Sequence, residues 1–237
     1  MKRQLIALLI AAASLTSMAQ VHSYCGDHRF DGEHRNEIAG YVMAGNNVIT
    51  RGFGGLSATY VRHITSRWSV TGSMQQQFGK PLFSIAASGA YRLPVWKFNF
   101  YFSGQMLYNR YHFAGANEFD TNLSATWEGP CFDVRLGLSY INYSVRGDGA
   151  TEPLTLTFGA GVSIRPRSSN WNIGLFFRNY DDYYYENWNI NWGIRFYAPL
   201  PLNMRLFGEL NIRPAGSISQ LASRYETSGK LGVKYVW

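Results

Sequence analysis

The residues with the clearest chemical potential are basic side chains that alternate with apolar residues along short stretches of the sequence. Fixed positive charges in a narrow passage favour anionic solutes. The more ordinary interpretation is that basic residues along such a wall pair with carboxylates or with phosphate groups. The residues predicted to line one common face are Arg67, Arg92, Lys97, Arg135, Arg165, Arg195, Arg205, Glu209, Lys230 and Lys234, with Glu209 opposite Lys230. The same face carries Glu118, Asp120, Glu128, Asp133 and Arg178.

Residue patterns for catalysis or metal binding are weak. No serine, histidine and aspartate stand at the spacing of a hydrolase triad, and no histidine, cysteine and carboxylate cluster has the spacing of a metal site. The glycine-rich stretch from Gly52 to Gly55 lacks the lysine and helix that follow a phosphate-binding loop. We therefore expect no enzyme activity, no catalytic residue, no metal and no cofactor.

The segment from Asp181 to Glu186 is the most distinctive connection in the chain, because three tyrosines lie between carboxylates. Aromatic rings beside carboxylates can bind a sugar, a peptide or calcium. A solvated hairpin tip is the more ordinary interpretation, and it is the one expected here.

The elements that position these residues are predicted to be strands. From Ile38 onward apolar and polar residues alternate with a period of two, as they do from Trp188 to Phe196. Most of the stretches are near the ~9–11 residues that a tilted membrane strand requires. The pattern predicts twelve strands, with ten as an alternative, at residues 37–43, 55–64, 67–78, 82–93, 96–110, 117–128, 131–144, 153–165, 170–180, 187–198, 203–213 and 225–237.

The connections between these stretches alternate between short and long, and only Gly79-Lys80-Pro81 breaks the pattern by being short. Short turns such as Thr65-Ser66 and Gly129-Pro130 alternate with longer segments such as 44–54 and 214–224. Aromatic residues gather at strand ends beside the short turns, as an interfacial girdle would. An antiparallel up-and-down β-barrel explains both observations, because its short turns lie at one end and its longer loops at the other.

The two ends of the sequence point to export and to a membrane barrel. Residues 1–19 begin with Lys2 and Arg3, continue with an apolar run and finish with small residues, which predicts a cleaved signal peptide. The final stretch carries apolar residues on one face of a strand and ends on an aromatic residue. This face, expected to serve as an assembly signal, consists of Leu231, Val233, Tyr235 and Trp237.

These ends, with the strand pattern, resemble bacterial outer-membrane β-barrel proteins. The resemblance implies an all-β transmembrane barrel over residues 37–237, a periplasmic tail over residues 20–36 and both termini in the periplasm. It also implies the lipid bilayer, lipopolysaccharide and the barrel-assembly machinery as partners.

Composition agrees with a membrane barrel and excludes other classes. Charged residues make up 16% and aromatic residues 16% of the chain, and the mean hydropathy is −0.19. These values fit apolar and polar faces that alternate. The formal net charge of +7 does not indicate nucleic acid as a partner, because the basic residues are spread along strands of an exported chain.

The expected function is porin-like passage or binding of small solutes, or a structural role in the envelope. One alternative is a plugged barrel that binds ligands or partners through its external loops. A less favoured alternative is a lipid-modifying hydrolase of the outer membrane, for which His112 is the histidine on the external side. A wall of small residues faces one of bulky aromatic residues, so an open path and a filled lumen both remain possible at twelve strands.

The chain has two cysteines, Cys25 and Cys131, and export would carry both to an oxidising compartment. The barrel topology places both on the periplasmic side. We therefore predict a disulfide between them, with a free or differently paired thiol in the N-terminal tail as the alternative.

Overall fold

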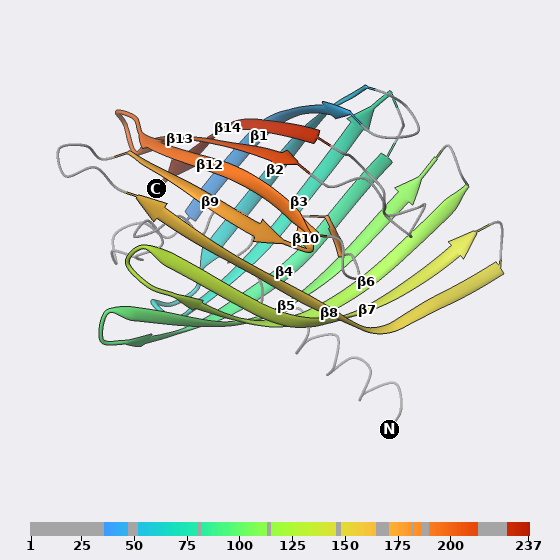
Figure 1. The fold of residues 1–237 in the computed structure, drawn as a ribbon, viewed down its shortest axis with the longest axis horizontal. Coiled ribbons are helices and arrows are strands. Elements are labelled where there is room, and N and C mark those ends of the chain that lie inside the picture. Colours follow the sequence, from blue (N-terminus) through green and yellow to red (C-terminus); the bar gives the residue numbers. More distant parts are fainter. Residues whose placement is uncertain are drawn as a thin grey trace.

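The computed structural model describes residues 36–46, 52–79, 82–112, 115–145, 148–164, 171–181, 183–185, 190–212 and 227–237. Within this part the chain closes into one twelve-stranded antiparallel barrel (Figure 1). The prediction of an all-β barrel with about twelve strands is confirmed. The barrel strands are β1 (Asn36–Asn46), β2 (Phe53–His63), β3 (Trp68–Phe78), β4 (Leu82–Val95), β5 (Phe98–Tyr111), β6 (Ala116–Glu128), β7 (Phe132–Val145), β8 (Asp148–Ile164), β9 (Asn172–Arg178), β12 (Asn191–Pro199), β13 (Met204–Ile212) and β14 (Thr227–Val236).

The two faces of each strand differ in polarity as the period of two requires. On β6, for example, Asn122 and Thr126 point into the barrel and are buried, whereas Leu123 points outward and is 63% exposed. Exposed large apolar residues form such outward rows around the described wall. Water would oppose an apolar surface of this extent, so the outer face is built to contact lipid. None of the described residues forms a helix long and apolar enough to cross a membrane.

The barrel closes where β14 meets β1. Tyr235 lies opposite Ile38 in the register, and backbone hydrogen bonds join Asn36 N to Trp237 O at 2.9 Å and Trp237 N to Asn36 O at 3.0 Å. Four residues predicted as an assembly signal, Leu231, Val233, Tyr235 and Trp237, are 40–50% exposed on the outer surface. Both ends of the described chain lie at the same end of the barrel as the short turns.

The wall of the barrel is uneven in length. Strands β4 to β8 have 13 to 17 residues, whereas β9, β12 and β13 have 7 or 9. In Figure 1, β6, β7 and β8 reach beyond the ends of β12 and β13. The chain leaves the wall directly after β9, although the sequence predicted a strand over residues 170–180.

Where the chain departs, Asn179 hydrogen-bonds two backbone groups of β8. Its side-chain amide donates to Leu156 O at 2.7 Å and accepts from Phe158 N at 2.7 Å. These two bonds replace the ladder contacts that a longer β9 would supply. The following residues form a small hairpin of β10 (Tyr180–Asp181) and β11 (Tyr184–Tyr185).

Candidate functional site

Three arginines from neighbouring strands lie inside the barrel, with aromatic rings between them. The guanidinium carbon of Arg135 on β7 lies 4.5 Å from the ring centre of Tyr180, and that of Arg178 on β9 lies 5.7 Å from the same ring. Arg178 also lies 4.5 Å from the ring of Phe176, and Arg195 on β12 lies 5.9 Å from it. We call these five residues the arginine–aromatic ladder.

Two glycines of β8 make room for the ladder. A Cβ atom at Gly159 would lie 2.8 Å from the Cβ of Arg178 and 3.0 Å from the ring of Tyr180. One at Gly161 would lie 2.5 Å from Nη2 of Arg195. Gly159 and Gly161 belong to the small-residue wall predicted from the sequence, and side chains of the ladder extend over them.

Most buried charges in the lumen are paired. Arg195 forms an ion pair with Asp133, Arg178 lies 2.5 Å from Glu209, and Lys230 lies 3.6 Å from the same carboxylate. The pairing interpretation offered for these side chains thus holds for much of the lumen. Because partners compensate each other's charge, the pairs reduce the net positive charge that a solute would meet.

Arg135 differs from the other two arginines of the ladder. It is 2% exposed, and its Nη2 donates to Oδ1 of Asn122 at 2.8 Å. Within the described part of the chain, its Nε and Nη1 have no hydrogen-bond partner. A buried guanidinium with unused donors favours the binding of an anion, because each unsatisfied buried donor destabilises the protein by about 1–3 kcal/mol.

The hairpin β10–β11 begins at Tyr180 of the ladder and folds into the lumen. Tyr183, at its tip, is 3% exposed and packs with Ala86, Leu107 and Ile141, which belong to β4, β5 and β7. A hydrogen bond of 2.9 Å joins its hydroxyl to that of Ser57 on β2. The expectation of a solvated hairpin tip is wrong for Tyr183, because the tip crosses the barrel interior instead.

A hydrogen bond from β5 also fixes the backbone of the hairpin. The side-chain amide of Asn109 on β5 donates to the carbonyl oxygen of Tyr183 at 3.1 Å, and to Glu118 at 2.5 Å. The hairpin thus contacts β2, β4, β5 and β7 and narrows the barrel at this height. Among the described residues, no group of three or more histidine, cysteine and carboxylate side chains is placed to hold a metal ion.

Comparison with known proteins gives no match to any protein-family model and none to a curated protein. Solved structures do match. The KdgM porin in complex with disordered oligogalacturonate has a TM-score of 0.58 at 10% identity, over 85% of this chain and 99% of that one. The NanC porin has a TM-score of 0.52 at 11% identity, over 84% and 98%. The COG4313 outer membrane channel of Pseudomonas putida F1 has a TM-score of 0.53 at 15% identity, over 90% and 98%.

The chain has the fold of an outer-membrane porin.

The porin fold places the predicted site residues at three levels of exposure. Arg135, Arg195, Lys230 and Lys234 are buried on the inner face. Arg92, Arg205 and Glu209 are half-buried there. Arg67 and Lys97, by contrast, are exposed in turns and do not line the lumen. The reason is geometrical, because the alternation of faces ends where each strand turns, and Lys97 lies over the ring of Trp96 at 4.8 Å instead.

Some predicted residues cannot be placed. Arg165 and Cys25 lie outside the described residues, and Cys131 is exposed beside the β6–β7 turn. The disulfide between Cys25 and Cys131 therefore stays a prediction. His112 is exposed next to the end of β5. Arg178 was assigned to the inner face from its sequence, but its partner Glu209 lies too far along the chain for spacing to reveal the pair.

We expect Glu209→Gln to destabilise the porin-fold barrel by about 3 kcal/mol, because it leaves Arg178 and Lys230 buried without their carboxylate. The measurement is urea unfolding from phospholipid vesicles. Arg178→Gln and the double variant complete a double-mutant cycle. If the losses of the two single variants simply add in the double variant, the pair is not coupled and the prediction fails.

Proposed function

We propose that this chain is an outer-membrane porin-like channel that passes small anionic solutes through a lumen narrowed by the β10–β11 hairpin. The observation that carries the proposal is the arginine–aromatic ladder. Guanidinium groups bind carboxylates and phosphates with directed hydrogen bonds, and aromatic faces contact the apolar face of a ring-shaped solute. A ladder of both offers successive weak sites, as conduction requires.

The chemistry of a sugar acid fits this arrangement best. Such a solute presents a carboxylate to Arg135, which keeps unused donors in the described part, and ring faces to Phe176 and Tyr180 beside the paired arginines of the ladder. The matched KdgM porin was solved with oligogalacturonate, an oligomer of a sugar acid. At 10% identity this likeness concerns the fold, so the choice of solute depends on the ladder of this chain.

The proposed location is the outer membrane. We infer that residues 1–19 are removed as a signal peptide, that the residues from Gln20 to the start of β1 form a periplasmic tail and that both termini lie in the periplasm. The barrel-assembly machinery would insert the chain among phospholipid and lipopolysaccharide. The outward apolar rows and the alternation of short and long connections support this placement.

We expect the purified barrel to conduct with a preference for anions, and Arg135→Gln to lower the anion-to-cation permeability ratio several-fold. Arg135 is the ladder arginine whose Nε and Nη1 have no partner in the described part, so its charge is least compensated. The measurement is the reversal potential across a potassium chloride gradient in a planar bilayer. Arg67→Gln is the matched control, because it removes the same charge from an exposed turn.

Two outcomes would contradict the proposal. A preference for cations in the wild-type barrel would mean that the ion pairs cancel the arginine charge. Absence of current, in a preparation whose mobility on unboiled gels shows a folded barrel, would favour a plugged barrel that acts through its external loops.

A further inference from the structure

A groove of about 430 Å³ lies on the outer face of the wall, across β8, β9, β12 and β13. Its sides are two rows of outward residues that are aligned by the strand register. One row is Val162, Leu175, Ile194 and Leu210. The other is Ala160, Phe177, Trp192 and Ile212.

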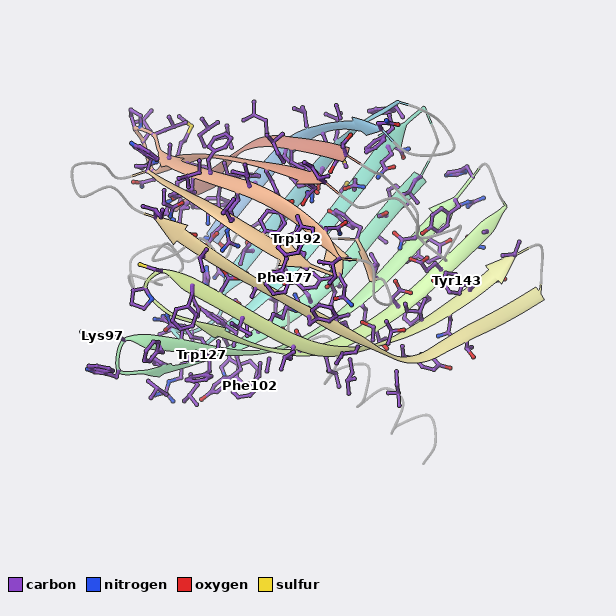
Figure 2. All side chains as sticks on the ribbon, viewed as in Figure 1. Lys97, Phe102, Trp127, Tyr143, Phe177 and Trp192 are labelled. Carbon is purple, nitrogen blue, oxygen red and sulfur yellow. The ribbon has the colours of Figure 1, made fainter. Side chains whose placement is uncertain are left out.

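The floor of the groove is the backbone between the two rows. It follows the register from Gly161 to Phe176 and Gly193. The ring of Phe176 occupies the space beside Gly193 that a side chain would need, because a Cβ atom at this position would lie 2.2 Å from the ring. The only outward alanine of the two rows, Ala160, leaves the groove open at β8. Figure 2 shows Phe177 and Trp192 close together on this wall, and their ring centres are 5.4 Å apart.

The length of the groove suits an extended hydrocarbon chain. It crosses four strands, so three inter-strand spacings of ~4.8 Å give it a length of roughly 14 Å. One leaflet contributes about half of the ~30 Å hydrocarbon thickness of a bilayer, which is a similar length. Because the strands are tilted, the register rows run obliquely to the membrane plane, and a lipid chain can enter along them.

We propose that this groove binds one acyl chain of a phospholipid. The inference rests on the proposed membrane location and concerns a site separate from the lumen. The groove is continuous with the apolar outer surface, whose natural occupant is lipid. From Leu154 to Ile164 on β8, and on β9, β12 and β13, the outward residues of the described part are all apolar. Among the described residues of this wall no cation faces outward to meet the phosphates of lipopolysaccharide, whereas a zwitterionic phospholipid needs none.

The concave shape of the groove also favours a lipid over a second copy of the chain as its occupant. Association of two such walls would need a ridge that fills the groove, but the described outward rows of the same wall flank it on both sides. A flexible acyl chain adapts to the groove without a complementary partner surface.

The test is native mass spectrometry of the refolded barrel in detergent micelles with phosphatidylethanolamine that carries two palmitoyl chains. We expect one lipid to stay bound to the wild-type barrel at a collision energy that removes all others. Ala160→Trp should abolish this adduct and Ala160→Leu should weaken it, since both fill the groove. Ala125→Trp is the matched control, because Ala125 is an outward alanine on β6, away from the groove.

Each variant is first checked for slower migration after boiling, which separates a folding failure from a binding failure. Retention of the adduct by folded Ala160→Trp would overturn the proposal, and so would equal loss from Ala125→Trp. A lipopolysaccharide adduct that survives equally well and also depends on Ala160 would overturn the choice of phospholipid. A dimer that disappears in Ala160→Trp would assign the groove to a second copy of the chain.

Discussion

Replacing Tyr183 with alanine is expected to raise the single-channel conductance roughly two-fold or more, since the narrowest part of a pore dominates its resistance. The Tyr183 ring lies in the barrel interior against Ala86, Leu107 and Ile141, and its hydroxyl bonds Ser57 on the opposite wall. Alanine removes both the ring and the bond. The hairpin would then lose its contact across the lumen, and the ion path would widen at this height.

Two further variants separate the ring from the hydroxyl and from any general loss of stability. Tyr183→Phe keeps the ring and removes only the 2.9 Å bond, so we expect a wild-type conductance with more frequent current fluctuations. Tyr140→Ala removes a tyrosine from the outer face of β7 and should leave conductance unchanged. If folded Tyr183→Ala conducts like the wild type, the hairpin does not control the path.

Deleting Tyr235 to Trp237 is expected to abolish the folded barrel. These residues pair with the start of β1, through the register of Tyr235 with Ile38 and the two backbone bonds between Trp237 and Asn36. Without them the start of β1 is left as an unpaired edge, and each unpaired backbone group in hydrocarbon costs several kcal/mol. The measurement is the yield of protein that migrates faster unboiled than boiled.

Trp237→Ala is the control for the aromatic side chain. It keeps every backbone group of the closing strand, so we expect it to lower the yield without abolishing folding. A normal yield of heat-modifiable barrel from the truncated chain would contradict the prediction, because it would show that β1 and β14 do not need this end of the seam.

The strands could be predicted from the sequence because the two faces of a barrel wall meet different solvents. The resulting period of two predicted residues 117–128 and 67–78, and the structure has β6 at Ala116–Glu128 and β3 at Trp68–Phe78. The prediction failed beyond Arg178, where the alternation of Asn179 and Tyr180 continues a strand pattern. What ends β9 is the pair of bonds from the Asn179 side chain to β8, a contact between distant residues that periodicity does not contain.

The candidate site could be predicted in part for the same reason. Alternation placed Arg135 and Arg195 on the inner face, and both are buried there. It also placed Arg67 and Lys97 there, because the positions of turn residues are not set by the strand period. Neither the pairing of Arg178 with Glu209 nor the position of Tyr183 over the lumen follows from local pattern. Both depend on which strands become neighbours after closure.

The unequal strand lengths give the barrel an oblique rim. Strands β6 to β8 extend beyond the ends of β12 and β13. Outward residues near the far end of β7, such as Asn142 and Ser144, are polar. The rim formed by the strands is therefore lowest beside β9 and β12. Electrical access resistance and diffusional capture should accordingly depend on direction. A solute that arrives from the side of β9 and β12 should meet the β10–β11 hairpin before it meets β6, β7 or β8.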